Sequence, residues 1–400
     1  MYAVYLSPLY ILFHVHVTIW LFKWLKACNE KLGKKPVRIV IGVIYWILSM
    51  CIVIGFFMPA GTEIERIFKG IGNYWLGVSL YMAFGILIAD LVRGLLLLTK
   101  NPEKKAKIHS RKMFVIGGSI VTAFIVIMCV WGIINAKIVR TTSYEVTIEK
   151  SADVEDMRIA LVSDIHLGYN IGCAQMQRMV DVINAADVDV VVIAGDFFDN
   201  EYDALENPDE LVSIFRQIKS KYGMYAVYGN HDIAEKILAG FTFDSGNDVK
   251  ESDPRMDKFV EDCGIVNLRD EGVMIEGVYF YGRPDSQKPG RGIDTRKSVT
   301  QIVAEAPQGV PIITIDHQPR ELHEKAAAGI DMDLGGHTHD GQLFPLNLTS
   351  RIIWENSAGY INIDSKMHSI VTSGVGLFGP NMRVATKSEV AVIDVHFTGR

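Results

Sequence analysis

Short motifs of acidic, amide and histidine residues follow one another through the second half of this chain. They are Asp164-Ile165-His166, Gly195-Asp196-Phe197-Phe198-Asp199, Gly229-Asn230-His231-Asp232, Asp316-His317 and Gly335-Gly336-His337-Thr338-His339. Each one comes directly after an apolar run of strand length. Five of the eleven histidines fall in these motifs, so their clustering is not an effect of composition.

The residue types in these motifs suit a transition-metal centre. Alternate side chains of a strand point to the same side, so Asp164 and His166 face one way, as do His337 and His339. Carboxylate oxygen, amide oxygen and imidazole nitrogen together favour Mn, Fe or Zn over Ca or Mg alone. These ligands exceed what one tetrahedral ion takes, which predicts two ions about 3.5–4 Å apart.

Alternating strand-like and helix-like segments would hold the motifs. Strands are expected at 158–163, 188–194, 224–228, 278–282, 310–315, 332–335 and 390–397. Helices are expected at 174–186, 209–222, 254–263, 294–306 and 319–328. The alternation predicts an α/β domain with buried strands. Such sheets place their sites just past the carboxyl ends of the strands, where the motifs lie.

The first third of the chain has a different composition. Four stretches, approximately 5–25, 39–58, 74–98 and 113–134, are apolar over the about 20 residues that cross a bilayer. Residues 1–140 contain 17 Lys and Arg against 5 Asp and Glu, whereas the remaining residues contain 23 against 41. We therefore expect a four-helix transmembrane module over 1–135, a polar linker over 136–156 and a water-soluble domain over 157–400.

The charges of the short loops predict an orientation in the membrane. The loop between the first two apolar stretches and the loop between the last two, with the residues at their edges, each carry six Lys or Arg against one Glu. The middle loop has equal numbers of basic and acidic residues. The positive-inside rule places the first and third loops in the cytoplasm. Four spans then put both termini outside, which predicts a multi-pass protein of the cell membrane with an extracytoplasmic catalytic domain.

Polar side chains within the spans favour structural roles. Asp90 has Arg93 as a helical neighbour near the cytoplasmic end, which favours an ion pair over a functional acid. His14 and His16 favour helix–helix hydrogen bonds over metal binding or a proton relay.

Composition also argues against several classes of protein. The acidic second half counts against nucleic acid as a partner, because phosphate backbones need clustered Lys and Arg. The five cysteines show no Cys-x-x-Cys spacing, which excludes a zinc ribbon and a thioredoxin motif. Whether Cys173 and Cys263 pair stays open.

The ordered motifs D-x-H, G-D-x-x-D, G-N-H-D, H and G-H-T-H resemble those of the calcineurin-like metallophosphoesterase family. The resemblance covers roughly 157–397, with every motif present, and implies the αββα sandwich of that family. The Gly336–Gln342 sequence GHTHDGQ, together with the preceding apolar stretches, resembles a membrane-anchored bacterial branch. That branch is similar to the UDP-diacylglucosamine hydrolases.

The resemblance further implies a role for each motif residue. Two divalent metal ions would share seven ligands: Asp164, His166 and His339 on the first, Asn230, His317 and His337 on the second, and Asp196 bridging both. His231 would protonate the leaving oxygen, with Asp232 orienting its imidazole. A metal-bridging hydroxide would attack phosphorus in line, and the general acid would contribute about 10²–10⁴ in rate.

Several residues outside these roles leave two readings open. Arg283, Lys288 and Arg291, in the loop 283–292, either bind an anionic substrate or form a solvated basic surface. Asp199 and Gln342 either support the metal ligands or are ordinary turn residues. The polar segment 240–253 either covers the site or faces the membrane.

Three functions fit the sequence. A phosphoesterase acting on an envelope or lipid-linked phosphate or pyrophosphate is favoured, because tethering brings such a substrate to the site directly. A nucleotide or phosphomonoester hydrolase outside the cell is the alternative within the same chemistry. A membrane sensor that uses the fold only to bind a ligand is disfavoured, because no metal ligand is missing.

Overall fold

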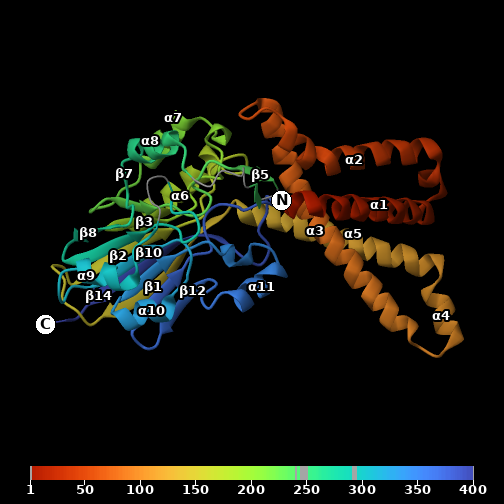
Figure 1. Cartoon of the computed structure of the whole chain (residues 1–400). Coiled ribbons are helices and arrows are strands. Elements are labelled where there is room, and N and C mark those ends of the chain that lie inside the picture. Colours follow the sequence, from red (N-terminus) through yellow and green to blue (C-terminus); the bar gives the residue numbers. More distant parts are fainter. Residues whose placement is uncertain (1, 239–240, 244–250, 291–294, 400) are drawn as a thin grey trace. The chain divides into compact units, whose positions relative to one another are not determined.

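A computed structural model of the chain describes residues 2–238, 241–243, 251–290 and 295–399 (Figure 1). The chain divides into two compact units. The helical unit comprises residues 1–133, 238–243 and 379–382. The second unit comprises 134–237, 244–378 and 383–400, and is called the catalytic unit below because it carries the predicted metal ligands.

Long helices make up the helical unit. Its elements are α1 (Tyr2–Cys28), the 3-10 turn η1 (Glu30–Gly33), α2 (Lys35–Phe57), α3 (Glu63–Leu97), α4 (Pro102–Ile108) and α5 (Arg111–Ala136). Four of these helices, α1, α2, α3 and α5, are long and apolar enough to cross a membrane. Each contains one of the four predicted apolar stretches. Helix α3 begins earlier than its apolar stretch because Thr62 caps it, with Oγ1 accepting from Glu65 N at 3.3 Å.

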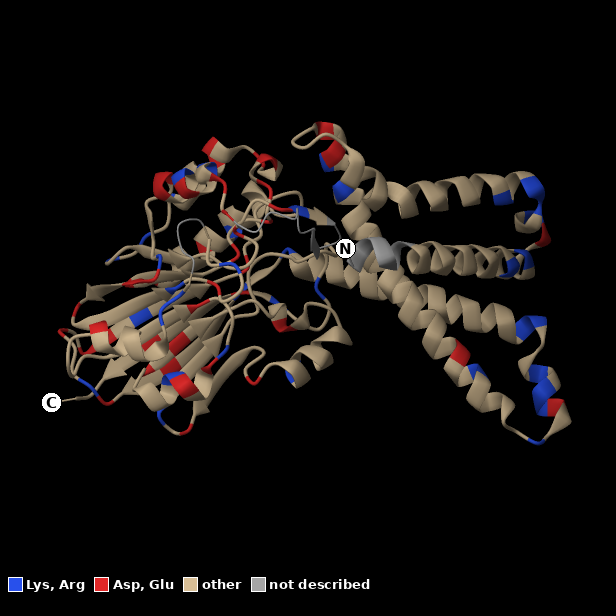
Figure 2. Cartoon of the chain, in the orientation of Figure 1, with Lys and Arg blue, Asp and Glu red and all other residues tan. Residues whose placement is uncertain are grey.

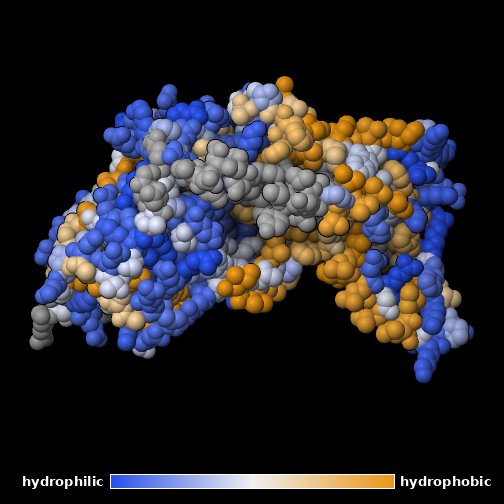
Figure 3. Space-filling view, viewed as in Figure 1, coloured by the Kyte–Doolittle hydropathy of each residue, from blue (hydrophilic) through white to orange (hydrophobic). Residues whose placement is uncertain are grey.

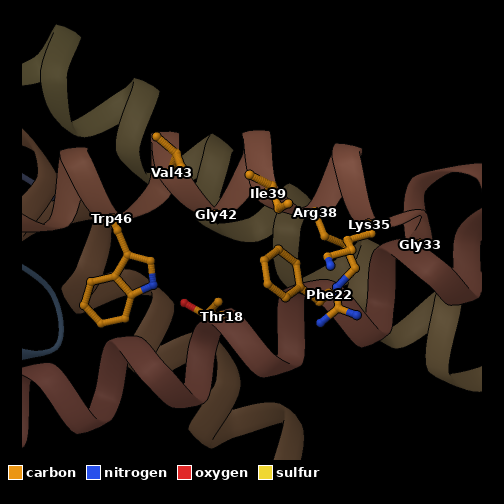
Figure 4. Close-up of a pocket in the computed structure, with 9 residues that line it drawn as sticks. All are labelled: Thr18, Phe22, Gly33, Lys35, Arg38, Ile39, Gly42, Val43 and Trp46. Carbon is orange, nitrogen blue, oxygen red and sulfur yellow. The ribbon is translucent and has the colours of Figure 1, made fainter.

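Basic residues gather at one end of the helical unit. Figure 2 shows Lys and Arg at the turn between α1 and α2 and around α4. A groove of about 700 Å³ lies between α1 and α2 (Figure 4). Phe22, Val43 and Trp46 line it, and Lys35 and Arg38 stand at the end nearest the basic turn. The two basic loops that predict the membrane orientation are therefore on the same end of this unit.

Buried hydrogen bonds join the first two helices. His14 is buried, and its Nδ1 lies 2.6 Å from Tyr45 Oη and 3.3 Å from Ser49 Oγ, both on α2. The helix–helix hydrogen bond predicted for His14 is confirmed, whereas His16 is exposed. The ion pair expected for Asp90 is not formed among the described residues, since Arg93 instead hydrogen-bonds His109 at 3.2 Å.

Two six-stranded sheets form the centre of the catalytic unit. The first has the order β1 (Val139–Ile148), β14 (Ser388–Phe397), β2 (Asp156–Val162), β3 (Val190–Ala194), β4 (Met224–Val227), β7 (Ile265–Asn267). The second has the order β12 (Gly359–Ile363), β13 (Met367–Val371), β11 (Met332–Gly335), β10 (Ile312–Asp316), β9 (Val278–Arg283), β8 (Glu271–Ile275). A separate two-stranded ribbon consists of β5 (Lys236–Leu238) and β6 (Phe241–Phe243).

Side-chain alternation along the strands creates the layers. Ile159 and Leu161 of β2 face the core between the sheets, whereas Ala160 and Val162 face the helices outside. Helices α6 (Cys173–Ala186), α7 (Pro208–Phe215) and α8 (Pro254–Asp262) pack on the first sheet. Helices α9 (Val299–Glu305) and α10 (Leu322–Ala328) pack on the second. The unit is thus the αββα sandwich that the resemblance implies, with η2 (Tyr202–Ala204), η3 (His339–Gly341) and α11 (Leu346–Ile353) between strands.

The segment 136–156, expected to be a linker, contains strand β1. All ten residues of β1 pair in parallel with β14, and Val146 and Ile148 are buried. The strand is at the edge of its sheet and otherwise alternates exposed with half-buried residues, which makes its sequence polar. Asp294, in the helix predicted at 294–306, and most of the segment 240–253 lie outside the described residues. All five cysteines are free, so Cys173 and Cys263 do not pair.

A buried ionic cluster joins α10 to the second sheet. Lys325 has no exposed surface, and its Nζ lies 2.7 Å from Asp333 Oδ1 and 3.0 Å from Asp316 Oδ2. Arg283 Nη1 also approaches Asp316 Oδ2, at 3.0 Å. Because Asp316 directly precedes His317, this cluster fixes the end of β10 at the predicted metal site.

Replacing Lys325 with Met is expected to lower the free energy of unfolding by about 3–5 kcal/mol, because Asp333 would keep a buried carboxylate without a cation. Denaturant-induced unfolding of the full chain in detergent measures this loss. The matched control is Lys366→Met at an exposed position, expected to change stability by less than about 0.5 kcal/mol. Equal, small effects of both substitutions would contradict the role of the cluster.

Candidate metal centre

The predicted metal ligands lie in turns directly after strands of both sheets. In the first sheet the strands β2, β3 and β4 are parallel neighbours, and so are β10 and β11 in the second. Neighbouring parallel strands have their carboxyl ends at one edge of the sheet. Motifs separated by more than a hundred residues in the sequence therefore meet.

One group of ligands comes from the turn after β2 and from η3. Asp164, His166 and His339 each offer an atom within 4.8 Å of the other two. His339 Nε2 lies 3.0 Å from His166 Nε2 and 3.3 Å from Asp164 Oδ1. All three side chains are buried.

A second group forms around Asp196, after β3. Asp196, His317 and His337 also offer atoms within 4.8 Å of one another. His317 Nε2 lies 3.1 Å from Asp196 Oδ2 and 3.2 Å from His337 Nδ1. Asp196 Oδ2 lies 3.7 Å from His166 Nε2 as well. Asp196 thus stands between the two groups.

The donor atoms fit divalent metal ions. The separations of about 3 Å between ligand atoms are close to those around one ion with bonds of about 2.1 Å. Asn230 Oδ1 and His166 Nδ1 are buried without a hydrogen-bond partner, a costly state that a cation at Asn230 would relieve. Burial lowers the pKa of His337 to about 3 and that of His339 well below its usual value. Both shifts favour the neutral imidazoles, which can offer lone pairs, whereas the pKa of His317, against the opposing effect of burial, is raised well above its usual value by the Asp196 carboxylate.

The backbone of the turns is held in an uncommon conformation. Five predicted ligands have φ between 50° and 72°: Asp164, His166, Asp196, His337 and His339. Non-glycine residues avoid this region, and such strain of about 1–3 kcal/mol each concentrates at functional sites. Glycine allows the turns to approach, since a Cβ on Gly336 would lie 2.5 Å from Asp164 Oδ2.

Neighbouring groups orient two of the histidines. Ala194 O lies 2.8 Å from His317 Nδ1, so this nitrogen carries a proton and Nε2 faces Asp196. Arg383 is fully buried and donates to the carbonyl oxygens of His339, Ser373 and Gly376 at 3.2, 2.6 and 2.9 Å. Arg383 thereby fixes the turn that carries His339. No sequence motif marks it.

His231 has a different partner from the one expected. Its Nδ1 lies 2.5 Å from Asn200 Oδ1, and Asn200 Nδ2 donates to Ile233 O at 3.0 Å. The two oxygens of Asp232 instead accept from Phe198 N and Gly229 N, at 2.8 and 2.7 Å. The prediction that Asp232 orients His231 is therefore wrong: Asp232 braces the turns, and Asn200 holds the imidazole. Burial lowers the pKa of His231 to about 4.

Asp199 forms a third such group with His166 and His231, whose ligand atoms also lie within 4.8 Å of one another, and Gln342 supports the centre from outside. Asp199 Oδ1 lies 3.4 Å from His166 Nδ1. Gln342 exchanges two hydrogen bonds with the backbone of Phe378, at 2.8 and 2.9 Å. The Phe378 ring lies 5.6 Å from the His231 ring and 5.9 Å from the His339 ring. Gln342 thus positions the Phe378 ring beside these two histidines, a contact that the sequence does not predict.

The substrate-binding role predicted for Arg283 is wrong. Arg283 is the last residue of β9, is 1% exposed, and pairs with Asp316 and Glu321 at 3.0 and 2.9 Å. Lys288 Nζ lies 2.6 Å from Glu235 Oε2, and Arg291 lies outside the described residues.

An exposed cation stands beside the centre instead. The Arg320 guanidinium lies 4.7 Å over the Trp354 ring, and that ring lies 5.1 Å from the His337 ring.

Comparisons with known proteins agree with this geometry. Residues 157–341 match the calcineurin-like phosphoesterase family. A zebrafish "transmembrane protein with metallophosphoesterase domain" is 28% identical over 82% of this chain and 72% of its own length. An uncharacterised metallophosphoesterase of Campylobacter jejuni is 24% identical over 88% of this chain and 90% of its own length.

Solved structures align only loosely. A 5'-nucleotidase precursor from Thermus thermophilus is 15% identical with a TM-score of 0.36, over 60% of this chain and 55% of that chain. The family match and the relatives, together with four helices long enough to span a bilayer, identify a membrane protein that binds divalent metal. Residues 157–341, somewhat less than half of the chain, match the calcineurin-like phosphoesterase family, and this match supports a metal-dependent phosphoesterase.

Proposed function

We propose that this chain uses two divalent metal ions to hydrolyse a phosphate ester or pyrophosphate of an envelope or lipid-linked substrate. The observation that supports it best is the meeting of two ligand groups at Asp196, in which every side chain is buried except the half-buried His337. Seven residues would hold the ions: Asp164, His166, Asp196, Asn230, His317, His337 and His339. Their mixed nitrogen and oxygen donors favour Mn, Fe or Zn.

The chemistry divides between the metals and the protein. Bound metals lower the pKa of water and offset the charge of the phosphate oxygens. His231 N donates to Asp196 Oδ1 at 2.8 Å, which keeps the imidazole beside the centre. Because Asn200 Nδ2 donates to Ile233 O, its Oδ1 faces His231 and accepts the Nδ1 proton. Nε2 of His231 is then left to take up a second proton, which the charged imidazole would pass to the leaving oxygen.

The substrate itself would adjust the protonation of His231. Burial keeps this imidazole neutral in the free protein, with its pKa lowered to about 4. An anionic phosphate beside it favours the charged form and raises this pKa. The acid would therefore form where the substrate is bound.

Removal of metal tests this proposal. The full chain in detergent is expected to hydrolyse an aryl phosphate monoester or diester, to lose turnover with a chelator, and to regain it with Mn²⁺. Lipid phosphates in vesicles and nucleotides in solution, assayed in parallel, separate the lipid-linked substrate from the soluble alternative. A folded protein without metal-dependent turnover on any of these substrates would end the proposal.

We also propose that the catalytic unit lies outside the cytoplasm, as the two basic loops favour. A reporter enzyme that works only outside the cell is expected to be active when fused after Arg400. Fusions after Gly61 and after Lys105, in the second and third loops, serve as the active and inactive controls. An inactive reporter at Arg400 with both controls behaving as expected would put the catalytic unit in the cytoplasm and contradict this proposal.

A further inference from the structure

Helix α11 carries a concentrated patch of exposed apolar side chains in the catalytic unit. Ile352 and Ile353 are 84% and 73% exposed, and Leu348 is 50% exposed. Phe344 and Leu346, just before and at the start of the helix, are 43% and 39% exposed. Figure 3 shows this hydrophobic patch where Figure 1 places α11. Five large apolar side chains within ten residues mark a surface that contacts something other than water.

The polarity of α11 is inverted relative to a helix on a water-soluble protein. Its buried residues are Asn347 and Ser350, and Ser350 Oγ lies 2.9 Å from Ser357 Oγ. A surface helix normally turns its apolar face to the core and its polar face to water. Here the polar face packs on the protein and the apolar face is exposed, as in a helix that lies in a membrane interface.

The same segment reaches the metal centre. Helix α11 begins four residues after Gln342 of the metal-binding motif and ends one residue before Trp354. The Trp354 ring lies 5.1 Å from the His337 ring and supports the exposed Arg320 guanidinium at 4.7 Å. A surface in contact with α11 would therefore lie next to a cation and to a predicted metal ligand.

We propose that α11 inserts its apolar side chains into the bilayer surface and thereby presents the phosphate of a membrane lipid to the metal centre. The occupant is lipid because the chain is a membrane protein and the patch is mainly aliphatic. Arg351, 60% exposed in its side chain, and Trp354 add residue types that favour membrane interfaces. Arg320 supplies a guanidinium for the lipid phosphate oxygens. The substrate part rests on the proposed function, whereas the contact of α11 with lipid does not.

Depth-dependent quenching tests the contact itself. The full chain, with its five native cysteines replaced, carries one fluorophore on Ile352→Cys and is reconstituted into vesicles. Lipids with a nitroxide near the headgroup are expected to quench this probe strongly. A probe on Lys366→Cys, an exposed polar position in the turn between β12 and β13, is expected to be unaffected. Equal, weak quenching at both positions would overturn the insertion of α11, whatever the activity.

A kinetic comparison tests the presentation of lipid. The double variant Ile352→Ser/Ile353→Ser is expected to lose at least tenfold in kcat/KM on a phospholipid phosphate in vesicles. Turnover of a soluble aryl phosphate should stay within twofold, and Val266→Ser, at an isolated exposed apolar position, should change neither. Equal losses on both substrates, or no loss on either, would overturn the presentation. Metal-dependent turnover of the aryl phosphate without turnover of any lipid phosphate by the unmodified chain would overturn the lipid substrate alone.

Discussion

Replacing Asp196 with Asn is expected to reduce metal-dependent turnover by about 10³-fold or more. Its Oδ2 lies 3.1 Å from His317 Nε2 and 3.7 Å from His166 Nε2, between the two ligand groups. The amide keeps the shape of the side chain but removes its charge, and its nitrogen offers no lone pair to a cation. Both ions would thus lose a shared ligand through one substitution.

The measurement pairs turnover with metal content. The purified full chain is assayed with Mn²⁺ and an aryl phosphate, and the bound metal per chain is determined by elemental analysis. Both quantities are expected to fall in the Asp196→Asn variant. The matched control is Asp394→Asn, which removes a partly exposed carboxylate paired with Arg158 and should leave both unchanged. Full metal content and more than a tenth of normal turnover in Asp196→Asn would contradict the bridging position.

The motifs could be found from the sequence because each one is local. A short run such as Gly229-Asn230-His231-Asp232 follows its strand directly, so the end of the strand positions it whatever the distant packing. The structure brings six of the seven predicted metal ligands into two groups, and it leaves Asn230 Oδ1 without a hydrogen-bond partner. That these residues bind metal is our proposal. The sequence alone predicts that their side chains lie close together at the ends of neighbouring strands.

The supporting contacts could not be predicted, because they depend on tertiary packing. Arg383 reaches His339 across 44 residues of sequence, and no pattern joins them. Asn200 and Asp232 both lie near His231, and only the directions of their side chains decide which of them accepts the hydrogen bond from its imidazole. The substrate-binding role predicted for Arg283 is wrong because the prediction rests on the basic composition of its loop, whereas Arg283 itself ends a fully buried strand.

Three of the strands that the sequence does not predict share one physical property. Strands β1, β8 and β12 lie at the edges of their sheets and expose several of their residues, whereas β13, also not predicted, lies inside its sheet and is mostly buried. Edge strands carry polar residues on the exposed face, so they lack the continuous apolar run that reveals β3 and β10. Helix α11 escapes prediction for a related reason, since its apolar residues do not face the core.

Replacing His231 with Asn is expected to lower kcat by about 10²–10⁴-fold on a substrate with a poor leaving group, such as an alkyl phosphate. The loss should be much smaller on a nitrophenyl phosphate, whose leaving oxygen departs without a proton. A residue that only maintained the fold would impair both substrates equally. The position of His231 favours the acid role, because its Nδ1 is already bonded to Asn200 and leaves Nε2 for the substrate.

Asn200→Leu serves as the matched second variant, because it removes the acceptor at 2.5 Å that orients the imidazole, together with the hydrogen bond from Asn200 Nδ2 to Ile233 O. Partners of this kind contribute about 10–100-fold, so the loss should be smaller than in His231→Asn. It should still be greater for the alkyl than for the nitrophenyl ester, since the same proton transfer is impaired. Leaving-group dependence that is unchanged in His231→Asn would assign the acid to another residue. If the loss depends on the leaving group in His231→Asn but not in Asn200→Leu, the imidazole acts as the acid without help from Asn200. The hydrogen bond between the two side chains would then have no part in the proton transfer.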